Sequence, residues 1–462
     1  MEIVAAQIYS KAVYGNFRQV WLIYYLFSSF FVLGLPKAIL YFFPLEKNKD
    51  RPSLISQIFS ALSVSAIVFA TVIFFISPVI GKSFSNPSII PLLRVFSVYI
   101  ALNLPTEIMI PLYLADHKLV KAGKTQIIFA LFYLLPLIIF IFFKFSLIYI
   151  FSALAVVTLF KLAWTWQTIR AEYGLKINLD INDKLRLILK YSIPISLSAI
   201  VGVSYDYLDK FLISIFYTNT FFAVFAIGTL KIPLIDIITY QLANSLVPTL
   251  SKLYKHNKNK LFLELWHAPI RRVTLIIYSA MFYFFFFADP IIPLIFSEKY
   301  IASIPIFKSY LLIMFLRITA YSPVIQALGE TKHIFRGSII GIFMNLVISL
   351  VLIGKIGYWG PVIGTIVANF FVILYYLFII QGKLKIKFKE ILPFKLLLMI
   401  ALDVAIIGFV TKLFVNYLNM GIVFEVVFGF IIFSIAVTVD ALWRKYITLN
   451  EILAIVGYEK KR

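Results

Sequence analysis

Apolar segments long enough to cross a membrane recur along almost the whole chain and are separated by short polar loops. A transmembrane helix needs about 20 mostly apolar residues. Thirteen segments meet that requirement: 18–43, 54–80, 89–114, 123–143, 146–169, 188–216, 219–246, 268–296, 302–328, 334–354, 357–381, 393–416 and 421–442. The pattern therefore predicts an all-α polytopic membrane protein with thirteen transmembrane helices and no soluble domain of useful size.

The basic residues are concentrated in every second loop. The chain has 43 lysines and arginines against 21 acidic residues, and the most basic segments are 170–190, 252–272, 382–395 and the tail after Trp443. Positively charged loops mark the cytoplasmic side of a membrane protein. The alternation predicts a cytoplasmic C-terminus, and it places residues 1–17 outside. It also explains the basic excess by topology, so nucleic acid is not an expected partner.

Composition excludes several kinds of site. The chain is 62% hydrophobic and 14% charged, and it has no cysteine. Disulfides, thiolate metal sites and cysteine nucleophiles are therefore excluded. The four histidines lack ligand-spaced partners, and no Gly-Lys-Ser/Thr phosphate loop is present. We expect no catalytic residue, metal or cofactor. The protein is therefore not expected to be an enzyme.

Two segments of the chain resemble each other at a distance of 212 residues. "PLYLADHKLVKAGKTQIIF", from Pro111, resembles "PVIQALGETKHIFRGSIIG", from Pro323. This shift superimposes 123–143 on 334–354 and spans six predicted helices, an even number, so the two halves share one orientation. Repeats of this kind are typical of secondary transporters. At the same shift, the counterpart of helix 188–216 falls before Met1, so we expect the first half to lack one helix.

The stretch "YSIPISLSAIVGVSYDYLDKFLISIFY" carries Asp206, Asp209 and Lys210 inside a predicted span. Each ionised residue at a helix centre costs roughly 2.5–3.5 kcal/mol, so this helix needs partners. Both aspartates share a helical stripe with Ser198 and Gly202, and Asp206 and Lys210 have the i,i+4 spacing of an intrahelical pair. We expect the stripe to face other helices or a water-filled cavity.

Further ionisable residues lie inside other predicted spans: Lys37, Glu107, Lys161, Lys231, Asp236 and Arg317. Intramembrane charges are commonly functional because hydrocarbon makes them costly. Two interpretations stay open. The charges line a hydrated cationic chamber, or neighbouring residues neutralise them and they serve only to order the helix bundle. Lys412 is expected to reach water at the outer membrane face. We expect only structural roles for Asp403, Glu425 and Asp440.

Several stretches resemble one known family. "YSKAVYGNFRQVWLIYYLFSSFFVLGLPKAILYFFP" is similar to the second-helix region of the polysaccharide biosynthesis flippases, the Wzx-type members of the multidrug/oligosaccharidyl-lipid/polysaccharide exporter superfamily. "YSIPISLSAIVGVSYDYLDKFLIS" resembles their seventh helix and "LANSLVPTLSKLY" the end of their eighth. "QALGETKHIFRGSIIGIFMNLVISLVLIGKIGYWGPVIGTIVANF" resembles their tenth-to-twelfth helix region.

The resemblance implies a fourteen-helix fold whose first helix has no counterpart here. It implies two pseudo-symmetric lobes around a central cavity, which alternate between inward- and outward-open states. The expected divisions are an N-lobe of five helices at 1–169, a cytoplasmic linker at 170–187, a C-lobe of six helices at 188–381, and two C-terminal helices with a cytoplasmic tail at 382–462.

The resemblance also implies a cargo and a location. A polyprenyl-diphosphate-linked oligosaccharide would be moved across the cytoplasmic membrane for a surface polysaccharide such as lipopolysaccharide, with membrane lipid as the other partner. We expect the diphosphate to be bound by cations through charge-assisted hydrogen bonds, namely by Lys37, Lys231, Arg317, Lys210 and Lys161. Four acidic residues would pair with these cations or couple transport to H⁺ or Na⁺: Asp206, Asp209, Asp236 and Glu107.

Two other functions remain open. One is a cation-coupled multidrug exporter of the same superfamily, in which Asp206 or Asp209 is the coupling carboxylate. The excess of buried cations favours an anionic cargo over this alternative. The other is a membrane glycosyltransferase or polymerase, which the short outer loops disfavour.

Overall fold

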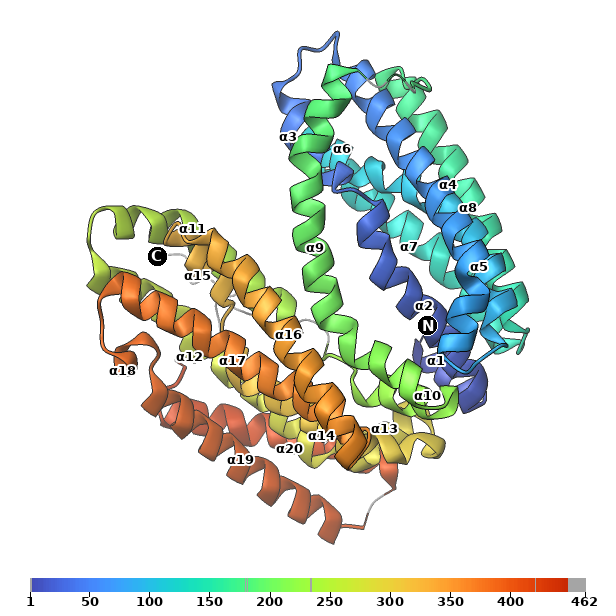
Figure 1. The fold of residues 1–462 in the computed structure, drawn as a ribbon. Coiled ribbons are helices and arrows are strands. Elements are labelled where there is room, and N and C mark those ends of the chain that lie inside the picture. Colours follow the sequence, from blue (N-terminus) through green and yellow to red (C-terminus); the bar gives the residue numbers. More distant parts are fainter. Residues whose placement is uncertain (1, 179, 181, 233–234, 420, 448–462) are drawn as a thin grey trace. The chain divides into compact units, whose positions relative to one another are not determined.

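The computed structural model is built from α-helices and short 3-10 helices (Figure 1). It describes residues 2–178, 180, 182–232, 235–419 and 421–447, with only the backbone described at 136 and 236–238. The predicted cytoplasmic tail therefore lies largely outside the described residues. The chain divides into two compact units, unit 1 (Met1–Ala223) and unit 2 (Val224–Arg462).

Unit 1 contains nine α-helices and the start of a tenth, among the residues described. They are α1 (Glu2–Ile8), α2 (Lys11–Phe31), α3 (Leu35–Phe42), α4 (Arg51–Ser83), α5 (Ile89–Asn103), α6 (Met109–Ala115), α7 (Leu119–Phe142), α8 (Leu147–Tyr173), α9 (Asp183–Phe216) and α10 (Asn219–Gly228), with 3-10 turns η1 (Phe43–Leu45) and η2 (Leu104–Ile108). Helix α5 packs against α4 and α8, and α9 packs against α2 and α3.

The predicted span 18–43 is a bent pair of helices. Helices α2 and α3 meet at an angle of 42°, and Leu33 and Gly34 between them have φ values of 53° and 65°. Such left-handed geometry favours glycine. A Cβ at Gly34 would also lie 2.4 Å from the backbone oxygen of Ser192 in α9. Gly34 therefore allows both the bend and the close approach of α9.

The chain after α8 is held along α4 by two serines. Ser56 accepts a hydrogen bond from the backbone N–H of Lys176 at 3.0 Å, and Ser60 accepts one from that of Asn178 at 2.9 Å. The predicted linker at 170–187 thus begins as part of unit 1. The predicted lobe boundaries stay a prediction.

Unit 2 contains the remaining helices. They are α11 (Ile235–Lys255), α12 (Asn259–Phe286), α13 (Ala288–Phe296), η3 (Glu298–Ser303), α14 (Ile304–Leu311), η4 (Leu312–Leu316), α15 (Tyr321–Ala327), α16 (Thr331–Ile356), α17 (Trp359–Leu384), α18 (Phe388–Ile391), α19 (Phe394–Tyr417) and α20 (Ile422–Trp443). Helices α16 and α17 pack closely because Gly364 faces Ser349, whose hydroxyl would lie 2.2 Å from an added Cβ. Helix α19 packs against α12 and α20.

The predicted internal repeat is visible in the helix boundaries. A shift of 212 residues places α6 on α15 with identical ends, and it places α7 and α8 on α16 and α17 to within two residues. An ion pair recurs at the same junction with its charges reversed. Lys118 pairs with Glu172 at 3.4 Å in unit 1. The equivalent Glu330 in unit 2 pairs with Lys383, one residue before the position equivalent to Glu172. The repeat therefore extends from the sequence to the local contacts.

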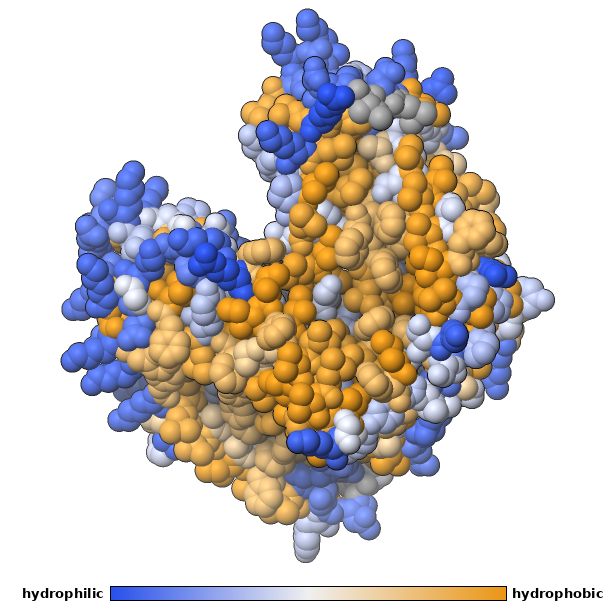
Figure 2. Space-filling view, viewed as in Figure 1, coloured by the Kyte–Doolittle hydropathy of each residue, from blue (hydrophilic) through white to orange (hydrophobic). Residues whose placement is uncertain are grey.

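Helix length and composition indicate a multi-pass membrane protein. Among the described residues, eleven helices are long and apolar enough to cross a membrane, or twelve if the bent pair α2 and α3 is one span. Large apolar side chains such as Phe75, Phe160 and Phe343 are exposed, and Figure 2 shows apolar side chains along the helix flanks of each unit. The predicted span 219–246 falls on α10 and α11. The segment between these two helices includes residues 233–234, which lie outside the described residues. The count of thirteen stays a prediction.

Candidate functional site

Unit 1 has a partly open cavity of about 960 Å³, lined by residues of α2, α3, α5, η2, α6, α7 and α8. Its volume is at the upper end of the roughly 300–1,000 Å³ that is usual for small-ligand sites. Nine lining residues are aromatic: Trp21, Tyr24, Tyr25, Tyr99, Phe129, Phe132, Tyr133, Phe160 and Trp164. Two of the predicted site residues, Glu107 and Lys161, also line it.

A single amide connects the charged residues of this cavity. Lys161, on α8, donates a hydrogen bond to Asn103 Oδ1 at 3.1 Å. The amide nitrogen of Asn103 lies within hydrogen-bond distance of the Tyr24 hydroxyl, at 3.0 Å, and of Glu107 Oε1, at 3.3 Å. Asn103 is itself only 5% exposed. The result is a cation and a carboxylate joined through a buried neutral group.

The chain positions these groups by changing its helix type. Helix α5 ends at Asn103, and Pro105 lies in the first turn of η2. A proline has no N–H for an α-helical hydrogen bond and clashes with the preceding turn, so it favours a local break. Glu107 follows within η2, four residues after Asn103. The break therefore places Asn103 and Glu107 at one wall of the cavity.

Packed rings form another part of the wall. The ring of Trp21 lies 5.6 Å from that of Tyr24 and 5.9 Å from that of Tyr99, both edge to face, and it stacks on Tyr25 at 5.7 Å. Aromatic pairs favour such geometries. The ammonium of Lys161 lies 5.0 Å from the centre of the Phe129 ring, within the range of a cation–π contact. Lys161 is thus held by a ring and an amide together.

The charges predicted on α9 occupy different environments. Asp209 is 2% exposed and Lys210 9% exposed, whereas Asp206 is exposed. Lys210 Nζ lies 3.6 Å from Asp209 Oδ1, and the same oxygen accepts a hydrogen bond from the Lys210 backbone N–H at 2.7 Å. The ammonium also lies 5.6 Å from the Tyr207 ring centre. Adjacent residues seldom face each other on a helix, and spacing pointed first to Asp206 and Lys210. The pair nevertheless agrees with the expected pairing of the acidic residues with the cations.

The other predicted site residues are divided between the units. Lys37 lies on α3 of unit 1 and is exposed. In unit 2, Lys231 is exposed between α10 and α11, and Arg317 is half-buried after η4. Asp236 lies in α11, and its side chain is outside the description. Their roles toward a diphosphate stay predictions.

Sequence reasoning did not identify Asn103 and Tyr24. Both are uncharged, so the search for costly intramembrane charges passed over them. The segment "NLPTE" did contain a usable signal, because a proline between Asn103 and Glu107 predicts a local break. Their convergence on Lys161, by contrast, depends on packing between distant parts of the chain.

The prediction that Lys412 reaches water stays a prediction, and the structure adds a protein partner for this lysine. Lys412 pairs with Glu425, so an ion pair joins α19 and α20, and its ammonium lies 5.1 Å from the ring centre of Phe287. Its side chain is only 17% exposed. A nearby carboxylate and a ring thus stabilise the charge of Lys412.

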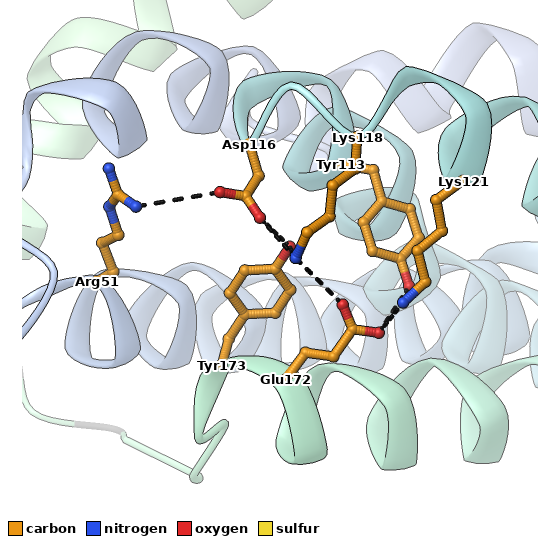
Figure 3. A network of polar contacts seen from close by, with 7 residues as sticks. All are labelled: Arg51, Tyr113, Asp116, Lys118, Lys121, Glu172 and Tyr173. Atoms are coloured by element: carbon orange, nitrogen blue, oxygen red, sulfur yellow. Dashed lines mark hydrogen bonds and ion pairs between the residues drawn. The ribbon is translucent and has the colours of Figure 1, made fainter.

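Seven residues form a polar network at the loop between α6 and α7 (Figure 3). It comprises Arg51, Tyr113, Asp116, Lys118, Lys121, Glu172 and Tyr173. Asp116 pairs with Lys118 at 2.7 Å and accepts a hydrogen bond from the Tyr173 hydroxyl at 2.8 Å. Burial by itself would raise the pKa of Asp116, but the hydrogen bonds from Lys118 and Tyr173 outweigh it and lower that pKa. The network ties the ends of α4, α6, α7 and α8 together.

The described residues contain no group of three or more histidine, aspartate or glutamate side chains arranged to hold a metal ion. The charged groups of the unit 1 cavity are instead one lysine and one glutamate. They can bind hydrogen-bonding ligands or exchange a proton.

The model of a family described as "Polysaccharide biosynthesis protein" matches residues 4–305, more than half of the chain. This match confirms the resemblance found in the sequence. No curated protein matches the chain.

Several solved structures share the fold. The lipid II flippase MurJ, in an inward closed conformation, has a TM-score of 0.71 and 15% identity, with 96% of both chains covered. An inward-facing multidrug resistance MATE family transporter of the MOP superfamily has a TM-score of 0.63 and 16% identity, covering 83% of this chain and 94% of that one. A MOP superfamily transporter from Pyrococcus furiosus, described as having a binding pocket of reverse polarity, has a TM-score of 0.52 and 14% identity, covering 84% and 91%. At these identities the likeness shows the fold alone.

Proposed function

Because the chain belongs to the polysaccharide biosynthesis protein family, we propose that it is a flippase for a polyprenyl-diphosphate-linked oligosaccharide. It moves this cargo from the cytoplasmic to the external leaflet of the cytoplasmic membrane, for assembly of a surface polysaccharide. The fold shared with MurJ and MATE transporters supports membrane transport. The observation that carries the proposal is the unit 1 cavity, where Lys161, Asn103 and Glu107 lie among aromatic side chains on helices long and apolar enough to cross a membrane. Such groups are costly in hydrocarbon, and a polar cargo gives them a role.

In this proposal the two repeats act as pseudo-symmetric lobes that alternate access to a central cavity. Lys37, Lys231 and Arg317 hold the diphosphate, together with Lys210 in the state that releases it from Asp209. The polyprenyl chain stays in lipid, because its burial among charges would cost free energy. Between transport cycles these cations are neutralised by four acidic residues, Asp206, Asp209, Asp236 and Glu107. Protonation of these carboxylates, or Na⁺ binding to them, releases the cations and couples that release to transport.

A second function is favoured by one feature of the same cavity. Glu107 lies in an aromatic-lined pocket, and carboxylates with aromatic faces suit amphipathic organic cations. A cation-coupled multidrug exporter would use the pocket in this way. Expression in a pump-deficient strain separates the two functions, because only the exporter raises resistance to toxic organic cations.

Replacing Lys231 by alanine tests the flippase. Purified protein in proteoliposomes is given a fluorescent polyprenyl-diphosphate oligosaccharide, and its appearance in the opposite leaflet is measured. Lys231→Ala is expected to stop flipping while the thermal unfolding temperature stays near that of the native chain. Lys355→Ala, an exposed cation at the end of α16, is the matched control and should flip normally. Normal flipping by Lys231→Ala would remove the central assignment.

A further inference from the structure

The charges in the unit 1 cavity balance each other. Lys161 brings one positive charge and Glu107 one negative charge, and Asn103 joins both by hydrogen bonds. A diphosphate entering this cavity would meet the carboxylate as well as the ammonium. The carboxylate would repel the diphosphate, and only one ammonium would attract it. The cavity is therefore better suited to a neutral polar group than to a multiply charged anion.

The walls combine flat rings with groups that form hydrogen bonds. Trp21 and its ring neighbours offer apolar faces held by mutual contacts, and Gln126 adds an amide on the exposed surface of α7. A hydrocarbon chain in this cavity would leave the polar groups without new partners, at a cost in free energy. A ligand with apolar ring faces and hydroxyl edges satisfies both parts of the wall, and sugars have this chemistry.

A second cavity shows the contrasting case. Unit 2 has a cavity of about 700 Å³ between α12, α13 and α20, lined almost wholly by apolar side chains. Two of its hydroxyls, those of Ser279 and Thr438, already donate to carbonyls of their own helices. Among the described residues, none of those that line it is charged. The unit 2 cavity therefore lacks the combination of aromatic and charged residues that lines the unit 1 cavity.

We propose that the unit 1 cavity is a binding subsite for sugar residues of the cargo. Asn103 and Lys161 hydrogen-bond to sugar hydroxyls, Glu107 accepts from them, and the rings around Trp21 stack on the sugar faces. The volume, about 960 Å³, accommodates more than one sugar residue. This inference rests on the proposed flippase function and deepens it, because it moves Lys161 from the diphosphate to the glycan.

Cysteine protection tests the subsite, since the native chain has no cysteine. Ala130→Cys places a thiol in the cavity lining, and Lys124→Cys places one on an exposed residue near the start of α7 that is not part of the lining. Both variants are reconstituted with no ligand, with lipid-linked oligosaccharide extracted from the source organism, or with the same lipid after its sugars are removed. Labelling by a polar maleimide is followed over time.

The intact glycolipid is expected to slow labelling at position 130 several-fold, and the sugar-free lipid to leave it unchanged. Position 124 should react at one rate in all three samples. Adding Asn103→Ala to Ala130→Cys should abolish the protection, whereas Asn103→Gln should retain part of it. Circular dichroism and thermal unfolding show whether each variant is folded.

Two outcomes would overturn the inference. Equal protection by the sugar-free lipid would assign the cavity to the diphosphate or the polyprenyl chain. Absence of protection by the intact glycolipid, in protein that flips it, would remove the subsite and leave the proposed function standing. Failure of the native chain to flip the glycolipid would instead count against the proposed function, and the labelling result would be judged separately.

Discussion

Lys161 donates a hydrogen bond to Asn103 at 3.1 Å, although 58 residues separate them in the chain. The pair joins α8 to the end of α5, and Asn103 continues the connection to Glu107 in η2. In the sequence, Lys161 is an isolated lysine inside a predicted span. The structure gives it a partner in the wall of the unit 1 cavity. Removal of this contact is the most direct test of the cavity.

Replacing Lys161 by alanine should reduce flipping about ten-fold or more. A hydrogen bond to a charged group is worth about 1.5–3 kcal/mol, and the change also leaves Glu107 without the balancing charge. Flipping in proteoliposomes is the measurement. Lys161→Arg keeps the charge and should retain more activity. Unchanged flipping by folded Lys161→Ala would show that the cavity takes no part in transport.

Replacing Gly34 by alanine should destabilise unit 1. Left-handed geometry costs a non-glycine residue roughly 1–2 kcal/mol, and the new Cβ would lie 2.4 Å from the Ser192 backbone oxygen. A backbone atom cannot turn aside as a flexible side chain can, so α9 must shift. Thermal unfolding in detergent should show a lower midpoint.

Gly202→Ala is the control for that change. Gly202 lies within α9, and an added Cβ would meet no heavy atom within 4 Å. Its unfolding midpoint should match the native value or rise slightly, because alanine favours helix over glycine. Equal midpoints for the Gly34→Ala and Gly202→Ala variants would contradict the account of the bend.

A double-mutant cycle should reveal coupling between Lys412 and Glu425. Removing one partner of a fully buried pair costs about 3–5 kcal/mol, and less is expected here because the side chains are 17% and 20% exposed. Lys412→Met and Glu425→Gln should each lower stability. The double variant should lose less than the sum of the two, as measured by denaturant unfolding. Strictly additive losses would show that the pair contributes no coupling.

The Asp116 network should make stability depend on pH. The pKa of Asp116 is lowered in the folded chain by Lys118 and Tyr173, after the opposing effect of burial. A lowered folded-state pKa stabilises the fold above the unfolded value, about 3.9, and this stabilisation is lost as pH falls through the folded value. Asp116→Asn should therefore be less stable than the native chain at neutral pH, by up to about 1 kcal/mol for a partly exposed pair.

Unfolding of both proteins between about pH 7 and pH 3 is the measurement, with the acid end below the ordinary aspartate pKa. The two stabilities should converge toward the acid end, because protonation of Asp116 then removes the same charge as the substitution. A constant difference in stability over the whole pH range would show that the pKa of Asp116 is the same in the folded and the unfolded chain.

Local patterns in the sequence predicted much of the fold. Runs of apolar residues identify helices without knowledge of their neighbours. Seven helices match predicted spans to within four residues at each end: α4, α7, α8, α16, α17, α19 and α20. The 212-residue repeat was also visible, because equivalent helices have matching lengths and turns. The cost of charge in hydrocarbon led to Glu107 and Lys161, which the structure brings into one cavity.

The sequence by itself determined which segments are helices and which of their charges need partners, since both follow from the residues within one turn or one span. Only the tertiary structure decided who those partners are. Asn103 meets Lys161, Lys210 pairs with Asp209, and Lys412 pairs with Glu425. Such pairings depend on the rotation of each helix and the distance between helices, which the packing of many side chains sets together.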